Sequence, residues 1–121
     1  MGVFQHPVEI GTPDGSRFLE VQAWVDSGAN YSQFPAVLLR RLGFVPTTTR
    51  RFRTADGRVV ERGMCWVPIR LRDEIAPTPI VFGENDSELL LGAVALESFS
   101  WGIDPVKRTL VPIEAKALGI S

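Results

Sequence analysis

The feature that most constrains the fold of this chain is an alternating segment that ends in an aspartate. Apolar residues occupy every second position of one stretch, namely Leu19, Val21, Ala23 and Val25. Because side chains alternate between the two faces of a β-strand, this pattern predicts a strand with one face in a core. Asp26, Ser27 and Gly28 follow at once. An aspartate is costly to bury without a partner and glycine permits a sharp turn, so the sequence predicts a carboxylate held in place for use.

On its own, this tripeptide favours an ordinary turn at the end of a strand, because Asp, Ser and Gly are frequent turn residues. A second motif changes that interpretation. Leu90-Leu91-Gly92 predicts an apolar strand that ends at a glycine. The residues after it predict a short helix over 93–96 and a closing hairpin through Ile103 and Leu110.

Together the two motifs resemble those of the retropepsin-like aspartic proteases, the single-domain relatives of pepsin. In that family an apolar pair precedes Asp-Thr/Ser-Gly-Ala, and two apolar residues and a glycine precede a short helix downstream. Here Trp24-Val25 and residues 26–29 match the first pattern, and Leu90-Leu91-Gly92 matches the second. The resemblance covers residues 4–113, and two motifs in the right order are far more specific than one. It implies an all-β fold, a single-lobe acid-protease barrel with one or two short helices.

Size and charge limit the other possibilities. With 121 residues, 45% of them hydrophobic, residues 1–121 are expected to form one domain, too small for the two lobes of pepsin. The net charge of −1 gives no reason to expect a nucleic acid or an anionic membrane as partner. No apolar run approaches the ~20 residues that span a bilayer, and no signal peptide is recognised, so a cytoplasmic location is expected. Whether the chain is a piece of a longer, anchored protein stays open.

The chain has too few cysteine and histidine residues for a disulfide, a histidine-rich metal site or a serine triad. The single Cys65 excludes an internal disulfide and is interpreted as a small buried residue. The single His6 argues against a histidine-rich metal site and against a serine triad through Ser27. Neither a metal nor a cofactor is therefore expected. The densest basic spots, residues 40–41 and 50–53, are interpreted as solvated faces.

Turn signals divide the rest of the chain into short elements. A helix is expected over 36–42, ended by Gly43, and a helical turn over 113–118, ended by Gly119. Asp56-Gly57 predicts a hairpin, because Asp-Gly is a strong signal for such turns. The expected extended segments are residues 3–10, 18–26, 31–34, 47–54, 58–62, 64–71 and 77–82, with a charged turn at 72–74.

Peptide hydrolysis by this chemistry needs two carboxylates, one as general base on a water and one, protonated, as donor to the scissile carbonyl. The chain has a single Asp-Ser-Gly, because Asp14, Asp56 and Asp86 lack parts of the pattern. The second aspartate is therefore expected from a second chain, with the two Asp26 side chains ~3 Å apart and sharing one proton. The predicted function is an aspartic endopeptidase that acts on peptide or protein substrates as a homodimer.

By the same resemblance, each motif residue has an expected role. Asp26 would act on the water, the Ser27 hydroxyls would interlock across the dimer axis, and the Gly28 amide would hold the carboxylates coplanar. Leu91 and Gly92 would support this loop from below. The residues expected to bind an extended apolar peptide are Trp24, Ala29, Asn30 and Leu90 in the cleft and Ala55, Asp56 and Gly57 in a flap that closes over it.

The chain also departs from the viral members of the family. Asn30 replaces their aspartate after the alanine, and Ala93 replaces their arginine after the second glycine, so an intersubunit ion pair is missing. The alternative function is a non-catalytic peptide-binding or assembly module with the same fold. The intact Asp26-Ser27-Gly28 favours the enzyme, because a pure binding role places no demand on the acid.

Overall fold

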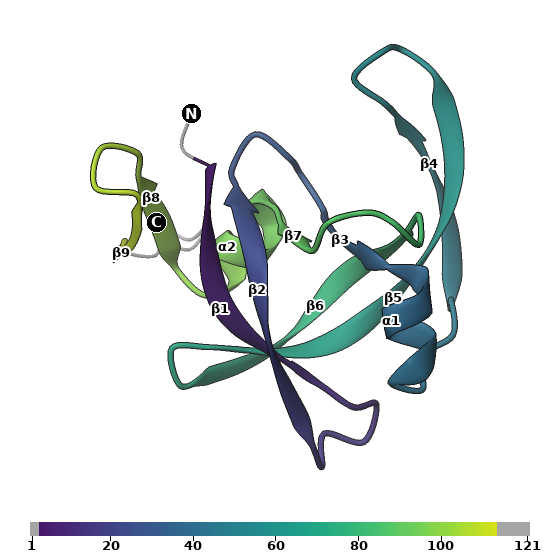
Figure 1. Cartoon of the computed structure of the whole chain (residues 1–121), viewed down its shortest axis with the longest axis horizontal. Coiled ribbons are helices and arrows are strands. Elements are labelled where there is room, and N and C mark those ends of the chain that lie inside the picture. Colours follow the sequence, from purple (N-terminus) through teal and green to yellow (C-terminus); the bar gives the residue numbers. More distant parts are fainter. Residues whose placement is uncertain (1–2, 114–121) are drawn as a thin grey trace, which may run out of the picture.

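The computed structural model describes residues 3–113 and contains short strands and two short helices (Figure 1). The strands are β1 (Val3–Gly11), β2 (Phe18–Asp26), β3 (Ser32–Pro35), β4 (Thr48–Arg53), β5 (Val59–Leu71), β6 (Glu74–Gly83), β7 (Leu90–Leu91), β8 (Trp101–Asp104) and β9 (Thr109–Pro112). The helices are α1 (Ala36–Arg41) and α2 (Ala93–Ser98). The expected all-β class with one or two short helices is confirmed. Within residues 3–113, neither helix is long and apolar enough to cross a membrane.

Seven of the strands form one sheet that curls back on itself. Its order is β1-β2-β7-β3-β6-β5-β4, and a further pairing joins β1 to β5 at Glu9–Arg70 and Ile10–Ile69. A twisted sheet whose early and late strands meet encloses its apolar face, as a barrel does. The core inside this sheet includes the fully buried side chains of Val8, Ile10, Val25, Phe34, Val67, Ile69, Ile80 and Leu91.

Strand β7 lies inside the sheet, between β2 and β3, although it is only two residues long. It pairs in parallel with β2, at Trp24–Leu90 and Val25–Leu91, and antiparallel with β3, at Gln33–Leu90. The chain that connects β2 to β3 therefore has to pass over the end of β7. We call this connection, residues 26–31, the Asp26 loop.

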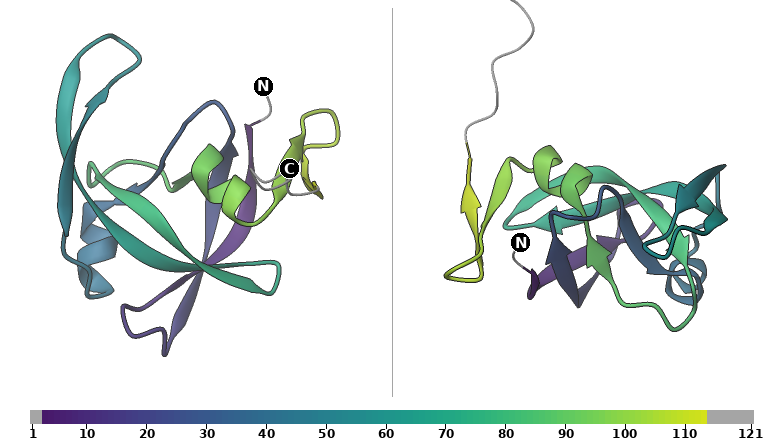
Figure 2. Two further views of the ribbon diagram at one scale, coloured as in Figure 1. Left: turned by 180° about the vertical axis from the view of Figure 1, so that it is seen from behind. Right: turned by 90° about the horizontal axis from the view of Figure 1, so that it is seen from above.

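The β4–β5 hairpin extends from the edge of this sheet, where β4 pairs with β5 alone. Its tip, residues 54–58, rises on the same side of the molecule as the Asp26 loop (Figure 1). Strands β8 and β9 form a separate two-stranded sheet at the opposite end of the molecule from that tip (Figure 2). The Asp26 loop and the β4–β5 hairpin are therefore the two elements that face one another.

Two strand predictions need correction. The two segments predicted at 58–62 and 64–71 are one continuous strand, β5, over residues 59–71, because β4 and β6 pair with successive parts of it. The alternation in β2 marks a core face only from Val21 onward, because Leu19 is 43% exposed. That end of the β1–β2 hairpin projects beyond the rest of the sheet (Figure 1).

Strand β6 begins at Glu74, which was expected in the turn, rather than at residue 77, and the ends of the other predicted elements agree more closely with the structure. Helix α1 ends one residue earlier than predicted, and Gly43 follows it with a φ of +104°. The turn between β5 and β6 consists of Arg72 and Asp73, whose positive φ values of 50° and 71° suit a two-residue hairpin. The predicted helical turn at 113–118 lies outside the described residues from 114 onward.

Candidate active site

Asp26 is the last residue of β2 and begins a tight turn. The Gly28 amide donates a hydrogen bond to Asp26 Oδ1 at 2.8 Å, and the Ala29 amide donates to the Asp26 carbonyl oxygen at 3.2 Å. Asp26 is half-buried, whereas Ser27 and Gly28 are exposed. No other group in residues 3–113 donates a hydrogen bond to this carboxylate. One oxygen is thus oriented by the backbone, and the other is available to a water or a second acid.

The hydrogen bond inside the tripeptide is not special in itself. Asp14 Oδ1 accepts from the Ser16 amide at 3.0 Å, and Asp104 Oδ1 accepts from the Val106 amide at 3.0 Å, in turns of similar spacing. The side chain of an aspartate commonly bonds the backbone two residues later in this way. The surroundings of Asp26, rather than its own turn, distinguish it from these two residues.

Gly92 supports the Asp26 loop from below. A Cβ atom on Gly92 would lie 2.7 Å from the carbonyl oxygens of both Ala29 and Tyr31, so no side chain fits there. Its φ of −99° is open to any residue, so the requirement is steric. The Gly92 amide also donates to the buried Ser32 hydroxyl at 3.0 Å.

Helix α2 and strand β7 complete this support. The Ala93 and Val94 amides at the start of α2 donate to the carbonyl oxygens of Ala29 and Asn30, at 2.7 and 3.0 Å. These amides have no partner within their own helix, so they are free to bind the loop. Leu91 is buried and pairs with Val25, the residue before Asp26. The two sequence motifs are therefore joined by direct hydrogen bonds.

Trp24 and Leu90 are neighbours on paired strands beside Asp26. Trp24 lies two residues before Asp26, so the two side chains share one face of β2. Its indole Nε1 donates to Glu88 Oε2 at 2.6 Å, and its amide donates to the Leu89 carbonyl oxygen at 2.8 Å. Glu88 was not predicted to take part, because an exposed glutamate in a polar segment carries no periodic signal.

The tip of the β4–β5 hairpin is held by contacts between near neighbours. The Thr54 amide donates to the Arg58 carbonyl oxygen at 2.8 Å, and Gly57 turns the chain with a φ of +87°. Asp56 accepts from the Thr54 hydroxyl and pairs with Arg58 at 3.0 Å. The Thr54 hydroxyl, followed by the Arg58 amide, lowers the pKa of Asp56. The hairpin predicted from Asp56-Gly57 is confirmed.

Tyr31 connects the base of the hairpin to the Asp26 loop. Arg50 Nη1 donates to the Tyr31 hydroxyl at 2.7 Å, and the guanidinium carbon lies 5.6 Å from the centre of the ring. Phe52 meets the same ring edge-on, with 5.8 Å between ring centres. Arg50 is exposed, in line with the interpretation of residues 50–53 as a solvated face, but it also binds the Tyr31 ring and hydroxyl. Tyr31 was missed because a lone aromatic residue in a loop has no periodic pattern to reveal it.

A cleft of about 670 Å³ lies between the Asp26 loop and the hairpin. Among the residues with predicted roles, Gly28, Ala29, Asn30 and Ala55 line it. Asp26 and Ser27 lie next to Gly28 at the margin of the cleft and do not line it, and neither do Trp24, Asp56, Gly57 and Leu90. The other lining residues come from strands β3, β4, β5 and β6 and from the residues directly next to β3 and β4. They are Tyr31, Gln33, Arg51, Phe52, Arg53, Thr54, Val60, Arg62 and Val81.

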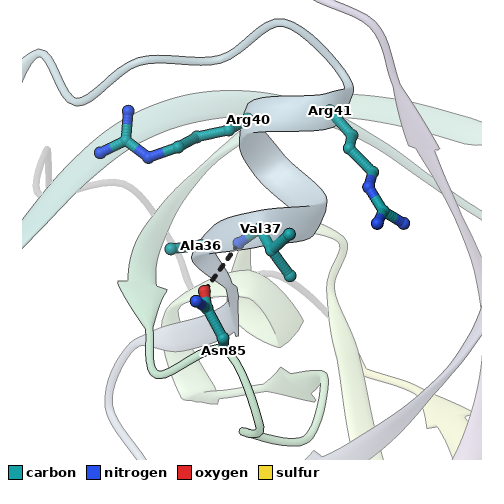
Figure 3. Close-up of a pocket in the computed structure, with 5 residues that line it drawn as sticks. All are labelled: Ala36, Val37, Arg40, Arg41 and Asn85. Carbon is teal, nitrogen blue, oxygen red and sulfur yellow. Dashed lines mark hydrogen bonds between the residues drawn. The ribbon is translucent and has the colours of Figure 1, made fainter.

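A second hollow of about 510 Å³ lies beside α1 (Figure 3). Asn85 Oδ1 accepts from the Val37 amide at 3.1 Å and so binds the start of the helix. The guanidinium groups of Arg40 and Arg41 point away from one another (Figure 3), and that of Arg40 lies over the Phe82 ring at 5.5 Å. Because no charged groups converge there, the cleft beside Asp26 is the candidate site.

Residues 3–113 contain neither a cluster of metal ligands nor an exposed thiol. No three His, Cys, Asp or Glu side chains in residues 3–113 lie close enough together to hold a metal ion. Cys65 is buried, as predicted, and burial raises the pKa of its thiol to about 11. A thiol in that state is largely protonated at neutral pH and is a poor nucleophile.

The sequence also matches a protein-family model. The model is described as aspartyl protease, and it matches residues 7–94, well over half of the chain and both motifs around Asp26 and Gly92. The chain belongs to the aspartyl protease family. No curated protein matches its sequence significantly.

Solved structures of related proteases have the same fold at low sequence identity. The retroviral protease-like domain of Ddi1 from Leishmania major is 21% identical with a TM-score of 0.60, over 93% of this chain and 89% of that one. The EIAV protease complexed with the inhibitor HBY-793 is 18% identical with a TM-score of 0.57, over 80% and 88%. The simian foamy virus (mac) protease is 16% identical with a TM-score of 0.54, over 78% and 94%. The predicted retropepsin-like fold is thereby confirmed.

Proposed function

We propose that this chain is an aspartic endopeptidase whose active site is completed in a homodimer. The observation that carries the proposal is the Asp26 carboxylate, which the Gly28 amide orients at 2.8 Å while its second oxygen is available. Membership of the aspartyl protease family supports the same chemistry. One such carboxylate is half of the required pair, because hydrolysis needs a general base and a separate acid.

The second carboxylate would come from Asp26 of a second copy. Ser27 and Gly28 are exposed in the single chain, so a two-fold contact at this loop would cover them. The two carboxylates would then lie ~3 Å apart and share one proton, because like charges at that distance do not both ionise. The ionised carboxylate would take a proton from the attacking water. The protonated one would donate to the scissile carbonyl oxygen and later help to protonate the leaving nitrogen.

The substrate would be an extended segment of a peptide or protein in the cleft between the Asp26 loop and the hairpin. Ala29 and Asn30 would meet its backbone, and Ala55 at the hairpin tip would close over it and exclude water. The EIAV protease, which shares this fold, is described in complex with an inhibitor. That complex supports ligand binding by this fold.

The alternative proposal is a non-catalytic peptide-binding or assembly module. The cleft itself supports it, because its walls from Tyr31, Phe52 and Val60 would hold a peptide without any help from a carboxylate. The two proposals differ in what Asp26 contributes. An enzyme loses its function without the acid, and a binding module keeps it.

The test compares the wild type with Asp26→Asn on a mixed peptide library at acidic pH, with new termini detected by mass spectrometry. Asn is nearly isosteric but has no base, so only the wild type should cleave. Asp14→Asn is the matched control, because Asp14 makes the same kind of turn away from the cleft. Equal cleavage by wild type and Asp26→Asn would exclude this mechanism, and binding without cleavage would favour the module.

The shared site has a separate test. Activity per chain should fall on dilution once the dimer dissociates, and an excess of Asp26→Asn chains should inhibit the wild type beyond simple dilution. Sedimentation over the same concentrations would show which species is present. Constant activity per chain well into the monomeric range would eliminate the homodimeric site.

A further inference from the structure

One glutamate beside the Asp26 loop is fixed at one oxygen and free at the other. Glu88 precedes β7, and its Oε2 accepts a hydrogen bond from the Trp24 indole Nε1 at 2.6 Å. Its second oxygen, Oε1, has no hydrogen bond or ion pair with any residue in 3–113. Glu84, in the same segment, is by contrast paired with Arg62. A carboxylate held in this way is preorganised for a cationic partner.

Strand pairing places this glutamate on the same side of the sheet as Asp26. Val25 is buried in the core, so its neighbours Trp24 and Asp26 both lie on the opposite face of β2. Leu90 pairs with Trp24 on one side and with Gln33 on the other, and Gln33 lines the cleft. The indole that holds the glutamate therefore belongs to the face that carries the acid and borders the cleft.

The acidic residues around Glu88 add to its negative charge. Asp86 lies two residues earlier in the chain and is exposed. Asp26 lies on the same face of the sheet, and in the proposed dimer two Asp26 carboxylates that share one proton keep one negative charge between them. A surface that carries one sign of charge attracts ligands of the opposite sign, so this side of the Asp26 loop attracts a cation.

The basic residues of the β4–β5 hairpin do not cancel this charge. Within residues 3–113, none of them lies within ion-pair distance of Glu88. Arg50 is bound to Tyr31 in the Asp26 loop. Arg51 and Arg53 alternate with Arg50 along β4, so their side chains extend toward the other face of the hairpin. A cationic group of a ligand would therefore find the free oxygen of the glutamate without a competitor.

We propose that Glu88 selects peptides with a lysine or arginine within about two residues of the cleaved bond. The position follows from the strand, because the two residues from Trp24 to Asp26 span ~7 Å, as do two residues of an extended peptide. The cationic side chain would bind the free Oε1, and the indole ring beside it would add attraction. The inference rests on the proposed function only for the place of the cleaved bond. The ligand is thus a mixed apolar and basic segment rather than the wholly apolar one expected from the sequence.

The test measures binding first. Full-length Asp26→Asn protein is titrated at neutral pH with two fluorescent peptide libraries that differ only in carrying arginine or citrulline, its uncharged analogue, at one position. The substitution removes the charge of Asp26, so a preference that remains cannot come from that residue. The arginine library should bind more tightly by about fivefold at low salt, as expected for a partly exposed ion pair. The preference should shrink at high salt, because added ions screen exposed charges.

Further substitutions in the same protein assign the preference to Glu88. Glu88→Gln should bring the two affinities together, because glutamine keeps an oxygen for the Trp24 indole and loses only the charge. Trp24→Phe removes the N–H that fixes the carboxylate and should give a partial loss. Glu20→Gln should keep the full preference, because this exposed acid lies four residues before Trp24 on the same face of β2, ~13 Å away. Thermal unfolding checks that each variant is folded.

The outcomes separate this inference from the proposed enzyme. In wild-type digests, a basic residue should lie within two residues of the new termini. Preferred binding of the arginine library without any cleavage by the wild type would support the selection of basic peptides and overturn the endopeptidase. Cleavage at bonds without a basic residue nearby would overturn the inference and leave the enzyme in place. Equal affinities for the two libraries, no binding of either, or a preference that survives Glu88→Gln would overturn the inference whether or not the wild type cleaves peptides.

Discussion

The Asp26 loop and the tip of the β4–β5 hairpin are both short turns built from an aspartate and a glycine, but different forces hold them. In each turn the aspartate Oδ1 accepts from the amide two residues later, at 2.8 Å for Asp26 and 3.4 Å for Asp56. Within residues 3–113, the hydrogen bonds that hold the tip join only six consecutive residues, 53–58. The loop, by contrast, is held by the Ala93 and Val94 amides, far along the chain, and Gly92 beside them donates to Ser32, the residue that follows the loop.

This difference separates a rigid element from a movable one. A turn whose contacts are local and exposed opens at little cost, because few buried interactions break with it. A loop that is hydrogen-bonded to a central strand and a helix stays in place unless the sheet itself opens. This division fits the proposed function. A catalytic carboxylate needs a fixed position, which the Asp26 loop provides, and a lid needs to move, which the hairpin tip can do.

The largest effect is expected from Gly92→Ala. The added methyl would meet two carbonyl oxygens of the Asp26 loop at 2.7 Å, so the loop or β7 has to shift. We expect a loss of about 3 kcal/mol in the free energy of unfolding, since overpacking against backbone atoms is costly. The measurement is urea unfolding. Gly57→Ala is the control, because nothing lies within 4 Å of its Cβ and its cost is the strain of a positive φ, about 1 kcal/mol. Equal losses would contradict the comparison.

Ser32→Ala should have the next largest effect. It leaves the buried Gly92 amide without its acceptor, at a cost of about 2 kcal/mol. The control is Ser98→Ala, because the Ser98 hydroxyl bonds an α2 carbonyl at an exposed position. Unfolding of both variants in urea should show a clear loss for Ser32 and almost none for Ser98. A Ser32 variant as stable as the wild type would show that the loop does not depend on this hydrogen bond.

Tyr31→Phe tests the link between the two regions. It removes the acceptor of the Arg50 hydrogen bond and keeps the ring contact with Phe52, so we expect a loss of about 1 kcal/mol, localised in the hairpin. Hydrogen exchange of the β4 and β5 amides should quicken while β2 and β7 stay protected. Arg51→Gln, one residue along β4, should leave these rates unchanged. Faster exchange throughout the sheet would mean that the hairpin is not a separate unit.

The smallest effect is expected from Asp56→Asn, and it should depend on pH. The pKa of Asp56 is lowered from 3.8 in the folded hairpin, so its ionised form stabilises the tip above that pH. This contribution is lost as the pH falls through the lowered pKa. NMR relaxation of the Gly57 amide should therefore show a more mobile tip in the variant at pH 6, and the two proteins should become alike in strong acid. Asp86→Asn, an exposed acid elsewhere, is the control.

How much could be predicted from the sequence depends on whether the signal is local. The strand before Asp26, the Asp56-Gly57 hairpin and the glycine after α1 were recognised because period and turn chemistry act between near neighbours. Leu90-Leu91-Gly92 was assigned a supporting role only through the family resemblance. Leu19 was assigned to the core face wrongly, because alternation cannot show where a strand leaves the sheet.

By itself, therefore, the sequence determined which residues form turns and strands, and which single acid ends an apolar strand. Only the tertiary structure decided what holds the loop that follows that acid: the α2 amides bound to the Ala29 and Asn30 carbonyl oxygens, the Gly92 amide bound to Ser32, and Tyr31 between the loop and the hairpin. It also decided that residues of β3, β4, β5 and β6 line one cleft beside the loop. The physical reason is that β7 enters the sheet between β2 and β3, so contacts between distant segments, which leave no local pattern in the chain, build the walls of the site.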